Sequence, residues 1–328
     1  MSKQNILVIG PGWIGDLIIS IALINALKER EEKVNIDILV NSNLSNIAKM
    51  IPKVRNVISS ETQHGSLSLS HRIKLGLRIK TENYSECYIL PNSLKSALIP
   101  LFANIPKRIG YLGEFRYGLI NRTMLPVDRS RGMVNKYLNL IDTTYNAKYR
   151  PQIVLNSSLS INNKFNLPKN YIVLCPDAEY GPSKRWPAEK WRDLARSLSK
   201  KSTVVIVGID KTIRDKLEEI ASKKIINLMS KTSIEEVVQV LNSSKTVVTN
   251  DSGLMHVAAA LNKKVIALYG SSSPSYTPPL IDDSKRAIIY KNLDCSPCFK
   301  RICPLGHTKC LNNISVNDVE QSIKSLQN

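Results

Sequence analysis

The segment 246–261, which reads T-V-V-T-N-D-S-G-L-M-H-V-A-A-A-L, constrains the fold more than any other part of the chain. Its first four residues are apolar or β-branched and predict a short buried strand. Asp251 and Ser252 then stand where a helix needs a cap, and Gly253 lets the backbone approach a ligand closely. His256 lies just inside the small-residue helix that follows. Free backbone N–H groups at such a turn predict an anion site; an ordinary turn beside a buried histidine is the alternative.

The same order of strand, glycine turn and helix occurs near the start of the chain. The turn 10–16 reads G-P-G-W-I-G-D and carries G-x-G-x-x-G in the position of a dinucleotide-binding fingerprint. The second strand, 34–40, ends in Asn41, so no acidic side chain stands where one would hold a ribose. Asp16 lies at the helix start, where the dipole and backbone amides keep a carboxylate ionised, which suits a general base. A structural preference for the helix N-terminus explains Asp16 equally well.

Strands and helices alternate along the whole chain, which predicts parallel sheets covered on both faces, the doubly wound α/β class. A stretch rich in Asn and Ser, 156–170, interrupts the alternation and predicts a linker. We expect a first domain over 1–160, a second over 168–312, and a terminal helix within 313–328 that packs near the domain junction. The expected strands are 5–9, 34–40, 86–90, 107–111, 171–175, 203–207, 225–228, 246–249 and 265–269, and the expected first-domain helices include 44–50, 91–102 and 133–145.

Composition limits the classes of partner. The 328 residues carry a formal net charge of +19, and the sequence pI is about 9.7. The basic residues are dispersed, which favours an anionic partner: nucleic acid, a membrane surface or a phosphorylated glycolipid. Aromatic residues make up only 6%, which disfavours an RNA-stacking surface. No apolar run approaches the roughly 20 residues of a membrane span and no signal peptide opens the chain, so we expect a cytosolic protein.

Two loops of the second half are expected at one edge of the sheet. The loop 176–187 carries Ser183 and Lys184, and the other loop carries Asp251. A cationic wall beside a helix N-terminus is what a nucleotide diphosphate requires, and it needs no metal. In the first half, Lys95 stands at the start of another helix that follows a strand, where it meets a phosphate or is simply solvated.

Four cysteines cluster near the C-terminus with the spacing C-x2-C-x4-C-x6-C, and His307 lies inside the cluster. Such clustering in a cytosolic chain is typical of a structural zinc site, although the spacing departs from paired C-x2-C knuckles. A redox-labile disulfide pair is the alternative, and reduced thiols are a third state. The residues concerned are Cys295, Cys298, Cys303 and Cys310.

Several ordered motifs together resemble those of the family 9 glycosyltransferases, the bacterial ADP-heptose:lipopolysaccharide heptosyltransferases. The resemblance extends over almost the whole chain, and a cysteine-rich tail also occurs in many members. The motifs are V-I-G-P-G-W-I-G-D at 8–16, L-P-N-S-L-K-S-A at 90–97, G-E-F-R-Y-G-L at 113–119, K-R-W-P at 184–187, T-N-D-S-G-L-M-H-V-A-A-A-L at 249–261 and Y-G-S-S-S-P-S-Y-T-P-P-L at 269–280.

The resemblance implies a GT-B fold, in which two facing doubly wound domains bind the acceptor and the ADP-sugar on either side of a central cleft. It implies an inverting, metal-independent single displacement with Asp16 as the general base. Lys184 would bind the donor phosphate and Asp251 the heptose hydroxyls. The further donor-site candidates are Ser183, Thr232 near the adenosine, Ser252, Gly253 and His256, and the candidates for acceptor phosphates are Lys95 and Arg116.

The partners implied by the resemblance are ADP-heptose and a phosphorylated Kdo–lipid A–heptose acceptor, with no nucleic acid and no required cofactor. The protein would lie peripherally on the anionic inner face of the cytoplasmic membrane. Within the family the motifs favour the second heptosyltransferase; the first, or another ADP-sugar transferase, is the alternative. A NAD-dependent oxidoreductase and a non-catalytic binder of anionic surfaces are the rival classes.

Overall fold

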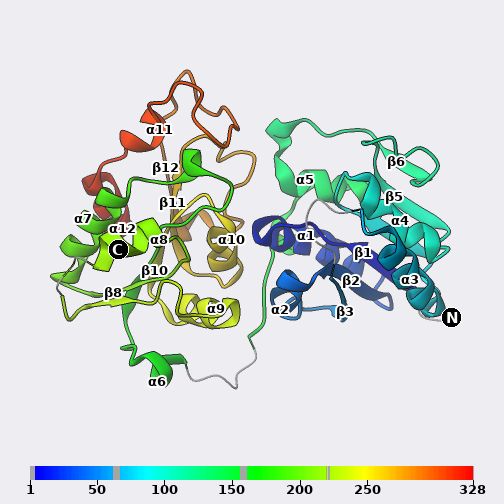
Figure 1. The fold of residues 1–328 in the computed structure, drawn as a ribbon, viewed down its shortest axis with the longest axis horizontal. Coiled ribbons are helices and arrows are strands. Elements are labelled where there is room, and N and C mark those ends of the chain that lie inside the picture. The colour runs from blue at the N-terminus through cyan, green and yellow to red at the C-terminus, as the bar shows by residue number, and fades with distance from the viewer. Residues whose placement is uncertain (1–3, 62–66, 156–160, 219, 221, 328) are drawn as a thin grey trace. The chain divides into compact units, whose positions relative to one another are not determined.

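The computed structural model describes residues 4–61, 67–155, 161–218, 220 and 222–327. The chain divides into two compact units, Met1–Val154 and Leu155–Asn328, each built on its own sheet (Figure 1). The expected linker is corrected in part. Its residues 156–160 lie outside the described part of the chain, whereas Ile161–Phe165 form helix α6, which packs against α9 (Ile234–Ser243). The second unit therefore begins before residue 168.

The first unit contains a six-stranded, fully parallel sheet in the order β3-β2-β1-β4-β5-β6. Helices α1 and α5 pack against each other, and so do α3 and α4. The strands are β1 (Asn5–Ile9), β2 (Asn35–Asn41), β3 (Val54–Ser60), β4 (Glu86–Ile89), β5 (Lys107–Tyr111) and β6 (Arg122–Met124). The helices are α1 (Ile14–Arg30), α2 (Ser45–Ala48), α3 (Leu69–Ile79), α4 (Leu94–Phe102) and α5 (Gly132–Leu138).

Helix α1 follows from the apolar run after the glycine turn. Residues Leu17–Leu27 are all buried, as expected of a helix that is apolar around its whole circumference. Gly10 has a packing reason of its own, because a Cβ there would lie 2.8 Å from a Val40 methyl carbon and 3.2 Å from the Leu39 carbonyl oxygen. Nothing lies within 4 Å of a Cβ built at Gly12. Close packing between β1 and β2 thus accounts for the first glycine of the fingerprint without any dinucleotide.

Two expected helices are shorter than the sequence suggested. The helix expected at 44–50 is only α2, entered through a 3-10 turn over Ser42–Leu44. The helix expected at 133–145 ends at Leu138 and continues as a 3-10 turn over Asn139–Ile141. Short apolar runs do not fix where a helix ends.

The second unit repeats the architecture with a parallel sheet in the order β12-β11-β10-β7-β8-β9. The five strands expected in this half are confirmed to within one residue at either end. The strands are β7 (Tyr171–Cys175), β8 (Thr203–Ile206), β9 (Ile225–Asn227), β10 (Thr246–Asn250), β11 (Lys264–Tyr269) and β12 (Arg286–Tyr290). The remaining helices are α7 (Ala188–Ser199), α8 (Lys211–Glu218), α10 (Gly253–Ala260), α11 (Lys309–Asn312) and α12 (Val316–Gln327).

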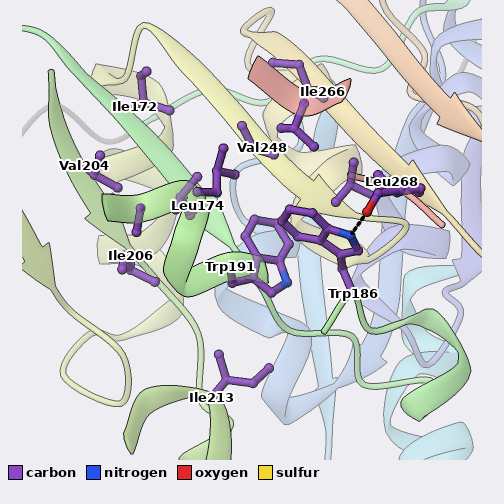
Figure 2. Packing of buried hydrophobic residues seen from close by; sticks show 14 of the residues in the cluster. Ile172, Leu174, Trp186, Trp191, Val204, Ile206, Ile213, Val248, Ile266 and Leu268 are labelled. Carbon is purple, nitrogen blue, oxygen red and sulfur yellow. Dashed lines mark hydrogen bonds between the residues drawn. The ribbon is translucent and has the colours of Figure 1, made fainter. Parts of the chain in front are cut away.

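A pair of tryptophans lies at the centre of the second unit's core. Trp186 and Trp191 meet edge to face with ring centroids 5.0 Å apart, among the aliphatic side chains of the sheet (Figure 2). The Trp186 Nε1–H donates to the Ile314 carbonyl at 3.1 Å. That bond connects the loop after β7 to the residues just before α12, which packs on α7, β11 and β12. The terminal helix therefore packs within the second unit, and its expected place near the domain junction stays a prediction.

None of the helices in the described ranges is long and apolar enough to cross a membrane.

Candidate functional site

A cavity of about 480 Å³ opens in the first unit where β1, β2 and β4 end. The glycine turn after β1 and the first turn of α1 form one part of its wall. The turn between β4 and α4 and one face of α5 form others. Because the carboxyl ends of parallel strands meet at one edge of the sheet, this is where a doubly wound unit binds its ligand.

Asp16 lies in the first turn of α1 and lines this cavity. Lys136 of α5 lines it as well, and α1 and α5 pack against each other. Burial lowers the pKa of Lys136, and the negative charge of Asp16 acts in the opposite direction. A carboxylate beside an ammonium group at the wall of a ligand-sized cavity is suited to taking a proton from a bound hydroxyl.

Two further cations line the same cavity. Lys95 is half-buried in the first turn of α4, where the sequence placed it. Arg72 of α3 is buried and donates to the carbonyls of Leu67 at 2.7 Å and Lys95 at 3.2 Å. Sequence reasoning missed Arg72 and Lys136, because no motif singles out one cation on a helix. The positive lining suits an anionic ligand.

The role predicted for Arg116 has to be corrected. Its side chain is fully buried, and its guanidinium donates to the carbonyls of Pro91, at 2.8 Å, and Tyr111, and to the Ser96 hydroxyl at 3.3 Å. Burial lowers the pKa of Arg116. Its donors hold the loop after β5 against the turn after β4, so it does not face an acceptor phosphate as the sequence suggested.

In the second unit the two loops expected at one sheet edge do meet there. Strands β7 and β10 pair directly, and Asn250 bridges the loops that follow them. Its amide donates to the Pro176 carbonyl at 2.6 Å and accepts the Trp186 backbone N–H at 3.1 Å. Lys184 and Asp251 are thereby brought together, with Nζ and Oδ2 2.5 Å apart. The Ser272 hydroxyl donates to the same carboxylate oxygen.

The Lys184 and Asp251 pair is largely withdrawn from water, with exposed side-chain fractions of 17% and 4%. The Lys184 ammonium also lies 5.0 Å from the centre of the Tyr180 ring. Helix α10 begins immediately beyond, with Ser252 as its N-cap and Gly253 as its first residue. An ammonium group next to a helix N-terminus is an arrangement that binds the phosphates of a nucleotide.

The remaining donor-site candidates differ in how they are placed. Ser183 is buried, and its hydroxyl donates to the Lys300 carbonyl and lies 2.9 Å from the Ser271 hydroxyl, so it supports the loop, which corrects its placement in the donor site. His256 is buried in α10, and burial lowers its pKa to about 4, with Asp251 opposing that shift. Thr232 is half-buried just before Ser233, the N-cap of α9.

The C-terminal thiols converge on one small cavity of about 20 Å³, lined by Cys295, Cys298, Cys303 and Cys310. All four are free cysteines in the structure. Backbone N–H groups, that of Thr308 foremost, lower the pKa of the Cys303 thiol. Within the described ranges no group of three or more His, Cys, Asp or Glu side chains is arranged to hold a metal ion. The structural zinc ion stays a prediction.

The chain consists of two doubly wound units, which is the architecture of the GT-B glycosyltransferases. The first unit has an acid and cations around a cavity, and the second has a lysine beside the turn between a strand and a helix. The sequence profile of glycosyltransferase family 9 (heptosyltransferase) matches residues 72–309. Lipopolysaccharide heptosyltransferase 2 of Salmonella typhimurium is 39% identical over 298 residues, 84% of this chain and 86% of that protein. The chain belongs to glycosyltransferase family 9 and is a glycosyltransferase.

Two other comparisons bear on the branch of the family. The solved structure of E. coli ADP-heptose lps heptosyltransferase II superposes with a TM-score of 0.84, is 33% identical and covers 98% of both chains. Lipopolysaccharide heptosyltransferase 1 of E. coli is 35% identical over 103 residues, but these are only 28% of this chain and 29% of that protein. In sequence, the similarity to type II enzymes extends over most of the chain, whereas the match to the type I enzyme covers only 103 residues.

Proposed function

We propose that the protein transfers heptose from ADP-heptose to the first heptose of the lipopolysaccharide inner core, the reaction of a type II heptosyltransferase. The support is the similarity to heptosyltransferase 2 along both units, set against the local match to heptosyltransferase 1. The observation that carries the chemistry is Asp16 at the wall of a cation-lined cavity in the first unit. That wall offers a base and positive charge to an acceptor that carries both a hydroxyl and phosphates.

In the proposed displacement, the Asp16 carboxylate takes the proton from an acceptor hydroxyl. The acceptor oxygen attacks the anomeric carbon of the heptose while the bond from that carbon to the phosphate oxygen breaks. The electron pair leaves with ADP, and attack on the opposite face inverts the anomeric centre. The ammonium of Lys184 and the N-terminus of α10 stabilise the charge that develops on the diphosphate. Because they supply this positive charge, we propose that the transfer needs no metal.

Asp251 has two roles in this proposal. Its carboxylate accepts hydrogen bonds from Lys184 and Ser272, which holds the ammonium at the helix N-terminus before the donor arrives. A carboxylate oxygen has several acceptor positions, so Asp251 can also accept a sugar hydroxyl. Ser252 and Gly253 would then contribute backbone N–H groups, and Thr232 would contact the adenosine.

We further propose that the enzyme acts in the cytoplasm, peripherally on the inner face of the cytoplasmic membrane, with ADP-heptose and a phosphorylated Kdo–lipid A–heptose as its substrates. No nucleic acid takes part. A structural zinc ion on the four cysteines is tested by metal analysis of the purified protein together with the unfolding temperature before and after a chelator. A chain without metal whose unfolding is unchanged by the chelator would refute the zinc prediction.

The experiment combines purified protein with ADP-heptose and a panel of truncated core acceptors, and products are weighed by mass spectrometry. Asp16→Asn should slow turnover by about 10²- to 10⁴-fold, the range typical of a lost general base, while ADP binding persists. Turnover by Asp16→Asn at the normal rate would refute the assignment of Asp16 as the general base. Tight binding of NADH would point instead to an oxidoreductase, and salt-dependent association without any product would point to a binder of anionic surfaces.

A further inference from the structure

The loop after β5 presents large apolar side chains to solvent. Phe115 and Tyr117 are 86% and 73% exposed, and Leu112 is 46% exposed. Leu125, just beyond β6, is 85% exposed. It lies near the start of the loop, because the Asn139 amide donates both to the Leu125 carbonyl at 3.2 Å and to the Tyr111 hydroxyl at 3.1 Å. Apolar side chains gathered in this way on a folded surface indicate an interaction site.

This loop is held firmly from beneath. Arg116, between the two exposed aromatic residues, is the fully buried arginine that donates to the carbonyls of Pro91 and Tyr111. The Glu114 carboxylate accepts the backbone N–H of Leu94 at 2.8 Å. Phe115 has a φ of 55°, in the left-handed region that bulky residues rarely adopt. A backbone fixed in this way keeps both aromatic rings in water, which needs a reason other than the packing of the unit itself.

Exposed basic side chains belong to the same segment of the chain as the apolar ones. Arg122 on the edge strand β6, and Arg129 and Arg131 in the 3-10 turn before α5, are all exposed. Residues 107–131 contain six basic and two acidic side chains. Of the six, Arg116 is buried, Lys107 pairs with Glu86 and Arg108 donates to backbone carbonyls, so the exposed charge comes from the other three arginines. Both acids already accept backbone N–H groups, Glu114 from Leu94 and Asp128 from Ser130. The surface therefore combines apolar projections with a net positive charge.

We propose that this surface, made of Leu112, Phe115, Tyr117, Leu125, Arg122, Arg129 and Arg131 and called here the β5–β6 surface, docks the first unit on an anionic lipid membrane. Aromatic and aliphatic side chains enter the boundary between headgroups and acyl chains, where Phe and Tyr rings are favoured, and the arginines meet lipid phosphates. Aromatic and basic side chains also bind single-stranded nucleic acid, but leucines offer no stacking face to a base. The exposed leucines favour the membrane.

The β5–β6 surface borders the cavity that contains Asp16, since Glu114 of the same loop lines that cavity. A membrane bound at the surface would hold the lipid end of a glycolipid outside while its sugars reach Asp16. The choice of membrane as partner thus rests on the proposed function. Docking at this site would make the acceptor cavity accessible from the bilayer rather than from bulk solution.

The test measures co-flotation of the full chain with vesicles of phosphatidylethanolamine and phosphatidylglycerol. The double variant Phe115→Ser/Tyr117→Ser should bind these vesicles at least about tenfold more weakly, since two largely exposed rings no longer enter the interface. The matched control is Ile209→Ser/Leu77→Ser, which removes side chains that are 77% and 55% exposed elsewhere and should change binding less than about twofold. Circular dichroism and the unfolding temperature check that every variant is folded.

A charge variant forms the second arm. Arg129→Gln/Arg131→Gln should weaken binding to phosphatidylglycerol vesicles several-fold and leave weak binding to phosphatidylcholine vesicles unchanged. The proposal is overturned if Phe115→Ser/Tyr117→Ser floats like the wild type. It is also overturned if Ile302→Ser, in the loop between Cys298 and Cys303, abolishes flotation instead. A Phe115→Ser/Tyr117→Ser variant that loses binding to an oligonucleotide but not to vesicles would overturn it as well.

Activity separates this proposal from the proposed function. The Phe115→Ser/Tyr117→Ser variant should lose transfer to a lipid-anchored acceptor in vesicles and keep transfer to a water-soluble acceptor that lacks the lipid. If Asp16→Asn transfers heptose to both acceptors at the normal rate, the proposed catalytic role of Asp16 is refuted. The flotation experiment does not depend on Asp16 and still tests whether the β5–β6 surface binds the membrane. If flotation is lost but both acceptors react equally, the surface does not serve acceptor delivery.

Discussion

The pair formed by Lys184 and Asp251 gives the sharpest quantitative prediction. Its two charged atoms lie 2.5 Å apart, and the Asp251 side chain is only 4% exposed. Lys184→Ala removes the positive partner and leaves a buried carboxylate that still accepts a hydrogen bond from the Ser272 hydroxyl. Removing one partner of a buried ion pair costs about 3–5 kcal/mol. Because the Lys184 side chain is 17% exposed and water can enter its place, we expect the lower end, about 3 kcal/mol.

A double-mutant cycle isolates the pairwise free energy. Asp251→Asn removes the carboxylate charge, so Lys184→Ala should cost only about 1 kcal/mol in that background, and the coupling free energy should be about 2 kcal/mol. The assay is urea unfolding of the four proteins, supported by thermal unfolding. A loss of 3 kcal/mol should lower the unfolding temperature of the second unit by about 6–12 °C. A coupling below about 0.5 kcal/mol would refute the buried pair.

The same variants report on the donor. An ammonium bound to a phosphate contributes about 1.5–3 kcal/mol, so Lys184→Ala should weaken ADP binding about ten- to a hundredfold in calorimetry. Arg192→Ala removes another cation of the second unit, on α7, whose partner is Asp193, and serves as the control. Unchanged ADP affinity in Lys184→Ala would remove Lys184 from the donor site.

Three other perturbations test the fold around the sites. Burial lowers the pKa of His256 from 6.5 to about 4, so the folded state resists protonation of the ring. The folded protein should therefore keep its full stability above pH 6.5 and lose about 3 kcal/mol as the pH falls to 4. The difference in urea midpoint between the wild type and His256→Gln, measured across this pH range, should show the loss. Gly76→Ala places a Cβ 2.6 Å from that of Phe102 and should cost about 1–3 kcal/mol in urea unfolding, whereas Gly12→Ala, with open space, should cost under about 0.5. Trp186→Ala should cost about 3–5 kcal/mol by the same measurement, and a loss below 1 would contradict its central place in the core.

Much of the architecture could be predicted because it follows from local patterns. Fully buried parallel strands read as short apolar runs, which is why β7 and β10 were placed from sequence within a residue. Edge strands were harder: β6 is short and exposed, so no apolar run marks it. Helix ends were also missed, as in α5, because the chain leaves the helix through a 3-10 turn that no proline or glycine announces.

The candidate sites divide in the same way. Asp16 and Lys184 could be predicted as candidates because one lies in the first turn of the helix after β1 and the other in the loop after β7, both at the carboxyl edge of a sheet. In the sequence, Arg116 cannot be distinguished from an exposed arginine. In the structure, its guanidinium donates to backbone carbonyls of a turn more than twenty residues away along the chain. Lys136 became a site residue only because α5 packs on α1.

Local sequence patterns were enough to predict the class of fold, the two doubly wound units and the turns proposed as ligand sites, because these depend on periodicity and on the chemistry of a few adjacent residues. Which charges meet became clear only from the folded chain. The partnership of Lys184 with Asp251, the burial of Arg116 and the exposure of Phe115 all depend on contacts between segments distant in sequence. Whether a charged or aromatic side chain is solvated, paired or enclosed is fixed by those contacts, and no local pattern encodes them.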